Sequence, residues 1–91
     1  MLTDEIARKL DINPRELEKQ SLRLYLEAKM RQVEADLFRL ANQYGVRTVQ
    51  EFDAQIVQGT LHEAEAFDDF FVFDHLESER DRLRAALDAL T

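Results

Sequence analysis

The 91 residues include twelve Lys or Arg and nineteen Asp or Glu, which gives a formal net charge of −7 at pH 7. The absence of cysteine excludes disulfides, thiol catalysis and thiolate metal sites. Only two glycines and one proline occur, and so few helix breakers predict a single all-α domain rather than a sheet with many turns.

The first predicted element is a short helix within residues 1–12. Thr3 can act as its N-cap, and the acidic side chains of Asp4 and Glu5 suit the positive end of a helix dipole. The apolar pattern breaks near Asp11, where we expect this helix to end.

A long helix is predicted over residues 13–45. Asn13 is a favoured N-cap, Pro14 fits the first helical position, and Glu16 can complete a capping box. The next breaker is Gly45, which suits the left-handed conformation that commonly ends helices. At 1.5 Å per residue the helix would be about 45 Å long.

This long helix carries two stripes of apolar residues. The first has the spacing of a heptad seam and consists of Leu26, Met30, Val33, Leu37, Leu40 and Tyr44. The second consists of Leu17, Leu24, Ala28, Ala35 and Phe38. Because two stripes need cover on more than one side, we expect at least two other helices to pack against this one.

Two more helices follow. A short one is predicted over residues 48–59, where Thr48 and Glu51 form a capping box. The last is predicted over residues 61–91, beginning at Leu61 or a few residues later. Its seam has heptad-like spacing and consists of Phe73, Leu76, Arg80, Leu83, Leu87 and Leu90. We therefore expect a long antiparallel helical hairpin with two short helices, the second of them at the bend, which dimerises into a helical bundle.

Four of the six phenylalanines lie within residues 66–75, among three aspartates. Phe70 and Phe73 continue the seam and are expected in the core. Two interpretations are open for Phe67 and Phe71: they fill the wide end of the bundle, or they stay exposed and anchor a partner, as aromatic residues do in binding hot spots. A strand over the Phe-Phe-Val-Phe run is a third interpretation. The residues predicted to bind a partner are Phe67, Asp68, Asp69, Phe71 and Asp74.

Charge is unevenly distributed along the chain. Residues 1–31 carry seven basic and six acidic side chains, whereas residues 32–91 carry five basic and thirteen acidic ones. The acidic part is expected to repel nucleic acid and to attract a basic partner, although an acidic surface also serves solubility alone. The first part leaves open a helix–turn–helix that contacts DNA through Arg8, Lys9, Arg15, Lys19 and Arg23.

No residue pattern predicts catalysis, a cofactor or a metal site. His75 and Glu79 are one turn apart, but the Glu-x-x-His motif of di-iron bundles is absent at both His62 and His75. No serine has the context of a nucleophile elbow, and no glycine-rich phosphate loop occurs. With no apolar run long enough to cross a bilayer and no signal-peptide pattern, we expect a cytoplasmic, non-enzymatic protein.

Short motifs along residues 6–80 resemble small antitoxin-like proteins of prokaryotic toxin–antitoxin pairs. In chain order they are Leu10–Leu17, Leu22–Glu27, Tyr44–Gly45, Glu51–Phe52, Ile56, Gly59–Leu61, Asp68–Phe70 and Leu76–Glu77. The resemblance implies a dimeric N-terminal part and a C-terminal part that wraps a toxin, which is often basic. Such antitoxins have a strand before the first helix, whereas only Met1 and Leu2 precede Thr3 here.

The prediction is therefore a non-catalytic, dimeric protein-binding module that neutralises a basic protein partner. A structural homodimer with no dedicated partner surface and a small DNA-binding regulator are the alternatives.

Overall fold

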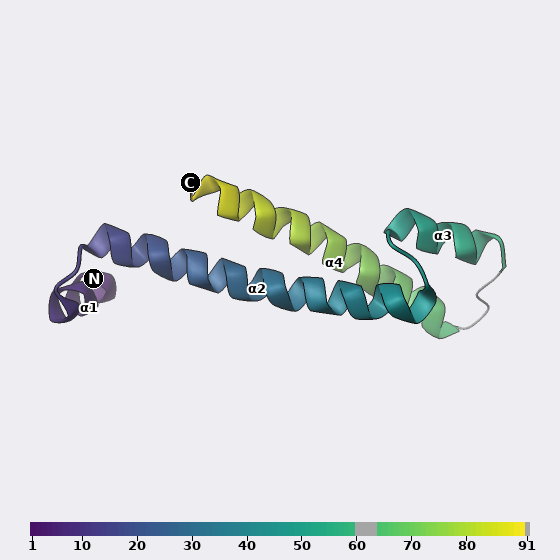
Figure 1. Cartoon of the computed structure of the whole chain (residues 1–91), viewed down its shortest axis with the longest axis horizontal. Helices are drawn as coiled ribbons and strands as arrows, with labels where there is room; N and C mark the ends of the chain where they lie inside the picture. The colour runs from purple at the N-terminus through teal and green to yellow at the C-terminus, as the bar shows by residue number, and fades with distance from the viewer. Residues whose placement is uncertain (60–63, 91) are drawn as a thin grey trace.

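The computed structural model describes residues 1–59 and 64–90, and within them it contains four helices and no strand (Figure 1). The helices are α1 (Leu2–Leu10), α2 (Pro14–Tyr44), α3 (Val49–Val57) and α4 (Ala64–Ala89). α2 and α4 pack together in opposite directions, α3 packs on α4 near the bend, and α1 folds against the first turns of α2 (Figure 1). The all-α prediction is confirmed.

The molecule is elongated, with dimensions of 60 × 21 × 19 Å. Its radius of gyration is 18.8 Å, whereas a compact chain of this length would have about 12 Å. None of the described helices combines the length and the low polarity needed to cross a membrane.

Both ends of α2 are set by local chemistry that the sequence predicts. The side-chain oxygen of Asn13 accepts hydrogen bonds from the backbone N–H groups of Arg15 and Glu16, at 2.8 and 3.3 Å. At the other end Gly45 has a φ of 66°, and its N–H donates to the carbonyl of Ala41. Such a left-handed residue closes the last turn of the helix, and glycine adopts this conformation with little strain.

α1 begins differently from the prediction. Thr3 does not cap it, because the helix already begins at Leu2, with Met1 as the N-cap residue and no side-chain hydrogen bond. Asp11, with a φ of 56°, ends the helix where predicted. Aspartate is one of the few residues that tolerate this left-handed conformation. Ala7 is fully buried, so the small side chain lets α1 lie close to its neighbour.

α3 begins with the predicted capping box. The Thr48 hydroxyl accepts a hydrogen bond from the backbone N–H of Glu51 at 3.1 Å. The Glu51 carboxylate in turn accepts one from the N–H of Arg47, at 2.6 Å. The predicted start of the last helix, at Leu61, lies outside the described residues, and α4 is described from Ala64 onward.

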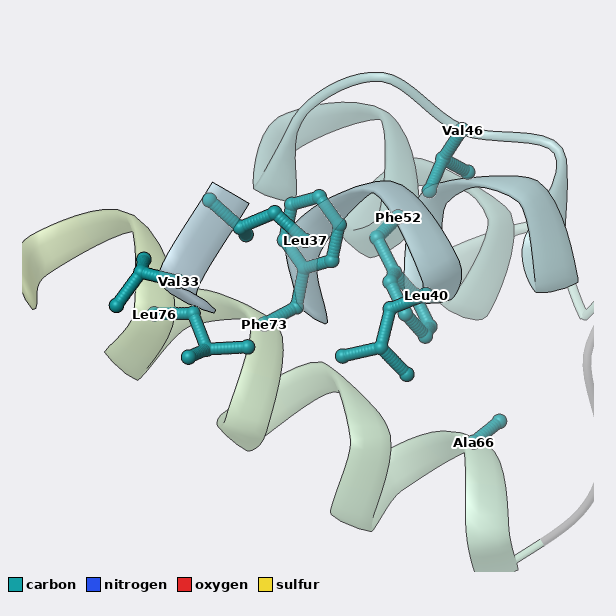
Figure 2. Close-up of a cluster of buried hydrophobic side chains, with 8 residues drawn as sticks. All are labelled: Val33, Leu37, Leu40, Val46, Phe52, Ala66, Phe73 and Leu76. Carbon is teal, nitrogen blue, oxygen red and sulfur yellow. The ribbon is translucent and has the colours of Figure 1, made fainter. Parts of the chain in front are cut away.

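The core lies where α2, α3 and α4 meet, and Figure 2 shows its side chains between these helices. It contains Val33, Leu37, Leu40, Val46, Phe52, Ala66, Phe73 and Leu76. Phe52 of α3 is fully buried at its centre, and its ring centroid lies 4.5 Å from that of Tyr44 and 6.0 Å from that of Phe73. The short third helix therefore contributes the aromatic residue that joins the two long ones.

The two apolar stripes of α2 differ in how far they are buried. The seam predicted to face the core does so, since Met30, Val33, Leu37 and Leu40 are all buried. The second stripe is covered only at its start, where half-buried Leu17 lines a groove with α1. Leu24 and Phe38 further along it are 67% and 69% exposed. The prediction that at least two other helices pack against α2 is confirmed, since both α4 and α1 do so. α1 reaches only the first turns of α2, so most of the second stripe stays uncovered in the single chain.

Candidate protein-binding surface

α4 divides its four phenylalanines between two faces. Phe73 is 1% exposed and Phe70 packs against the core, as predicted for the seam. Phe67 and Phe71 are 48% and 65% exposed. With 100° per residue, they lie one turn apart on the side of α4 that faces away from α2. Within the single chain, the interpretation in which all four rings fill the core is therefore wrong. A strand in this segment is also wrong, since the segment is helical throughout.

Three aspartates accompany these rings, and they have two different roles. Asp68 and Asp74 are exposed on either side of the phenylalanine pair. Asp69 is half-buried, and its carboxylate accepts a hydrogen bond from the hydroxyl of Tyr44 on α2. Asp69 is thus turned toward the inside of the hairpin. We call the remaining exposed group the α4 outer patch; it consists of Phe67, Asp68, Phe71 and Asp74.

The exposed ring of Phe71 packs against the ring of Phe70. Its centroid lies 5.4 Å from that of Phe70, with an interplanar angle of 74°. Phe70 in turn makes an edge contact with Phe52 at 5.8 Å. A chain of aromatic contacts therefore connects the exposed ring to the core. Such support reduces the conformational freedom that an anchor residue loses on binding.

A second exposed apolar surface lies on α2. Helical periodicity places it about 160° from the buried seam, so it faces away from α4. We call it the α2 outer stripe; it consists of Leu24, Ala28, Arg31, Ala35 and Phe38, all exposed. The sequence predicts that its apolar members are covered by another helix, and within the single chain no described helix covers them. The two outer surfaces thus lie on opposite sides of the helix pair.

The basic residues predicted to contact DNA lie at the other end of the hairpin from α3. Arg8 and Lys9 are exposed in the last turn of α1. Arg15 and Lys19 are exposed in the first turns of α2, and Arg23, one turn further, is half-buried. This end is remote from the α4 outer patch, because α4 begins near the bend (Figure 1).

The histidines show no arrangement for metal binding in the described part of the chain. The Nε2 atom of His75 lies 3.9 Å from a carboxylate oxygen of Glu79, and both residues are on the surface of α4. No group of three potential ligands occurs among the residues whose side chains the structure describes. His62 lies outside the described residues.

A groove of about 350 Å³ lies between α1 and the start of α2. Its walls are mostly aliphatic, with Leu2 and Ile6 on one side and Leu17 and Leu22 on the other. Glu18 is its single charged side chain among the described residues. A lining of this kind offers apolar contact but no acid–base pair for catalysis.

Comparisons with known proteins place the sequence in a family but assign no activity. No curated protein and no solved structure matches it, so the resemblance to antitoxins stays a prediction. A family model matches residues 1–91, and its description names no substrate or partner. The chain belongs to the Uncharacterized protein MJ0235 family.

Proposed function

We propose that this protein is a non-catalytic, dimeric protein-binding module that binds a basic protein surface through the α4 outer patch. The observation that carries the proposal is the exposure of Phe67 and Phe71 beside Asp68 and Asp74. Two neighbouring phenylalanine rings in water favour burial, at about 25 cal/mol per Å² of apolar surface. Aromatic anchors inside a polar rim are the usual composition of a binding hot spot.

Charge supports a basic partner. Residues 32–91 hold thirteen acidic and five basic side chains. Neither Asp68 nor Asp74 forms an ion pair with another described residue. Acidic groups at the rim of an interface speed association with an oppositely charged protein and disfavour acidic competitors. The resemblance to antitoxins suggests a toxin as the partner, which this protein would neutralise by covering its surface.

The proposal is tested by capture from native cell extract at low salt, with the tagged full-length chain as bait. Its two arms are the double variant Phe67→Ser/Phe71→Ser and the control Tyr25→Ser, which removes a comparably exposed ring of α2 that belongs to neither the α4 outer patch nor the α2 outer stripe. We expect a basic protein in stoichiometric amount with the wild type and the control. The double variant should bind the purified partner about tenfold or more weakly.

Capture that is equally strong with the double variant would contradict the proposed surface. Recovery of the chain alone would favour the structural homodimer. A third result, salt-sensitive binding to duplex DNA that is lost in Arg15→Ala/Lys19→Ala, would favour the DNA-binding regulator instead, since phosphate contacts weaken steeply with salt.

A further inference from the structure

We infer that the α2 outer stripe is the contact between two copies of this chain, packed antiparallel with Arg31 near the two-fold axis. The inference deepens the proposed function, because it identifies the surface through which the proposed dimer forms. It rests on the proposed function only in taking the protein to be a dimer. It uses the opposite side of the helix pair from the α4 outer patch. The two surfaces can therefore be tested separately.

The stripe has the composition of a helix–helix contact. Leu24, Ala28, Arg31, Ala35 and Phe38 are spaced four, three, four and three residues apart, which keeps them on one face of the helix. Leu24 and Phe38 provide large apolar groups near its two ends. Ala28 and Ala35 are small, so that a second helix can approach closely between them.

The order of side chains along the stripe reads nearly the same in both directions. Leu24 and Phe38 each lie seven residues from Arg31, while Ala28 and Ala35 lie three and four residues from it. A second α2 turned end for end would therefore place Leu24 close to Phe38 of the other copy, and the two alanines close to each other. An isologous contact requires such self-complementarity, because one patch must fit itself.

The antiparallel arrangement also provides charge complementarity. Glu27 and Glu34 lie one turn before and after Arg31, along the same edge of the stripe. Within the described part of the chain, none of the three forms an ion pair. A two-fold antiparallel contact brings the same edge of both helices together, so that each Arg31 lies among Glu27 and Glu34 of the second copy. A parallel contact would instead bring that edge against the edge with Gln32 and Arg39, where Glu34 would lie near Arg39 of the second copy. The near-palindromic order of the stripe, rather than charge, therefore favours the antiparallel arrangement.

The chain has enough exposed surface for such a contact. Its accessible area is 6823 Å², whereas a compact monomer of this mass would expose about 5,500 Å². A standard dimer interface covers about 800 Å² on each partner. The excess is thus larger than what one stable interface removes.

The first test is the mass of the full-length chain in solution, by sedimentation over a range of concentrations. We compare wild type, Leu24→Ser/Phe38→Ser, and the control Val57→Ser/Phe71→Ser, which removes two comparably exposed apolar side chains from α3 and α4. Circular dichroism checks that each variant remains helical. The stripe variant should dimerise about tenfold or more weakly than the wild type, and the control should dimerise normally.

The second test determines whether the two α2 helices of the dimer run antiparallel or parallel. Because the chain has no cysteine, Ala28→Cys and Ala35→Cys each introduce a single thiol with little change in volume. In an antiparallel contact the two variants form a mixed disulfide when they are combined, in preference to either self-linked dimer. Self-linked dimers of each variant without the mixed species would show a parallel contact, and the absence of both would exclude the stripe as the interface.

Failure of this inference is distinguishable from failure of the proposed function. A monomeric wild type whose partner binding still needs Phe67 and Phe71 overturns the inference and leaves the α4 surface standing. A dimer that is lost in Phe67→Ser/Phe71→Ser but kept in Leu24→Ser/Phe38→Ser overturns the inference and makes the α4 outer patch the self-contact. A stripe-dependent dimer with no protein partner supports the inference and removes the partner-binding proposal.

Discussion

The hydroxyl of Tyr44 donates a hydrogen bond to the carboxylate of Asp69, which joins the last turn of α2 to the first turns of α4. The two residues are 25 positions apart, and the bond is partly buried. The same tyrosine ring packs on Phe52 of α3. A single side chain therefore connects all three helices that form the bend.

Removing this hydroxyl should weaken the bend while leaving its packing intact. We expect Tyr44→Phe to lower the free energy of unfolding by about 1 to 2 kcal/mol, because the Asp69 carboxylate loses a donor in a partly buried place. Urea denaturation followed by circular dichroism measures the change. The control is Tyr25→Phe, which alters an exposed tyrosine on α2 and should have no effect. Equal midpoints for Tyr44→Phe and the wild type would contradict the prediction.

Phe52 should be among the most sensitive positions for stability. It is fully buried and contacts aromatic rings of both long helices. Replacing a buried phenylalanine by alanine costs about 3 to 5 kcal/mol through lost apolar contact and the cavity that remains. Thermal unfolding of Phe52→Ala, compared with Val57→Ala on the exposed side of the same helix, measures this difference at equal protein concentration. A loss no larger than that of Val57→Ala would show that α3 does not stabilise the hairpin.

Gly45 offers a test of backbone strain without steric contact. A Cβ atom built at this position would meet nothing within 4 Å, but the φ of 66° disfavours any L side chain. Gly45→Ala should therefore lower the free energy of unfolding by about 1 kcal/mol. Gly45→Asn should cost less, since asparagine tolerates the left-handed region better. An alanine variant as stable as the wild type would mean that the end of α2 rearranges.

Arg80 is the charged member of the α4 seam and is only partly compensated. Its Nε atom is buried without a hydrogen-bond partner among the described residues, and a carboxylate oxygen of Asp81 lies 3.6 Å from it. Replacing an imperfectly paired, partly buried charge by an apolar side chain is often neutral or stabilising. We expect Arg80→Met to raise the free energy of unfolding by up to about 1 kcal/mol.

The matched control for this substitution is Arg82→Met, at an exposed position of the same helix, which should change stability little. A clear loss of stability in Arg80→Met alone would show that the guanidinium contributes a contact that the hairpin needs.

Helix starts, helix ends and the core seam follow from sequence because their causes are local. Asn13 and Thr48 cap the helices they precede through hydrogen bonds to N–H groups two or three residues away. Gly45 ends α2 through its own backbone conformation. Thr3 is the counterexample: its sequence context suits a cap, but α1 begins one residue earlier and includes it.

The composition of the candidate surface was decided by tertiary contacts. Periodicity separates Phe67 and Phe71 from Phe73, yet it does not say whether another helix covers them. The same holds for Phe38, which sequence reasoning placed under another helix and which the single chain leaves exposed. Asp69 belongs to the same acidic run as Asp68, but its bond to Tyr44 removes it from the outer patch.

The sequence by itself thus determined the helices, their ends and the seam, because spacing along the chain and hydrogen bonds to nearby backbone groups act over a few residues. Only the tertiary structure decided which apolar side chains remain in water and which aspartate is hydrogen-bonded within the chain. Burial depends on how many helices are present to cover a face, and α4 covers only one face of α2.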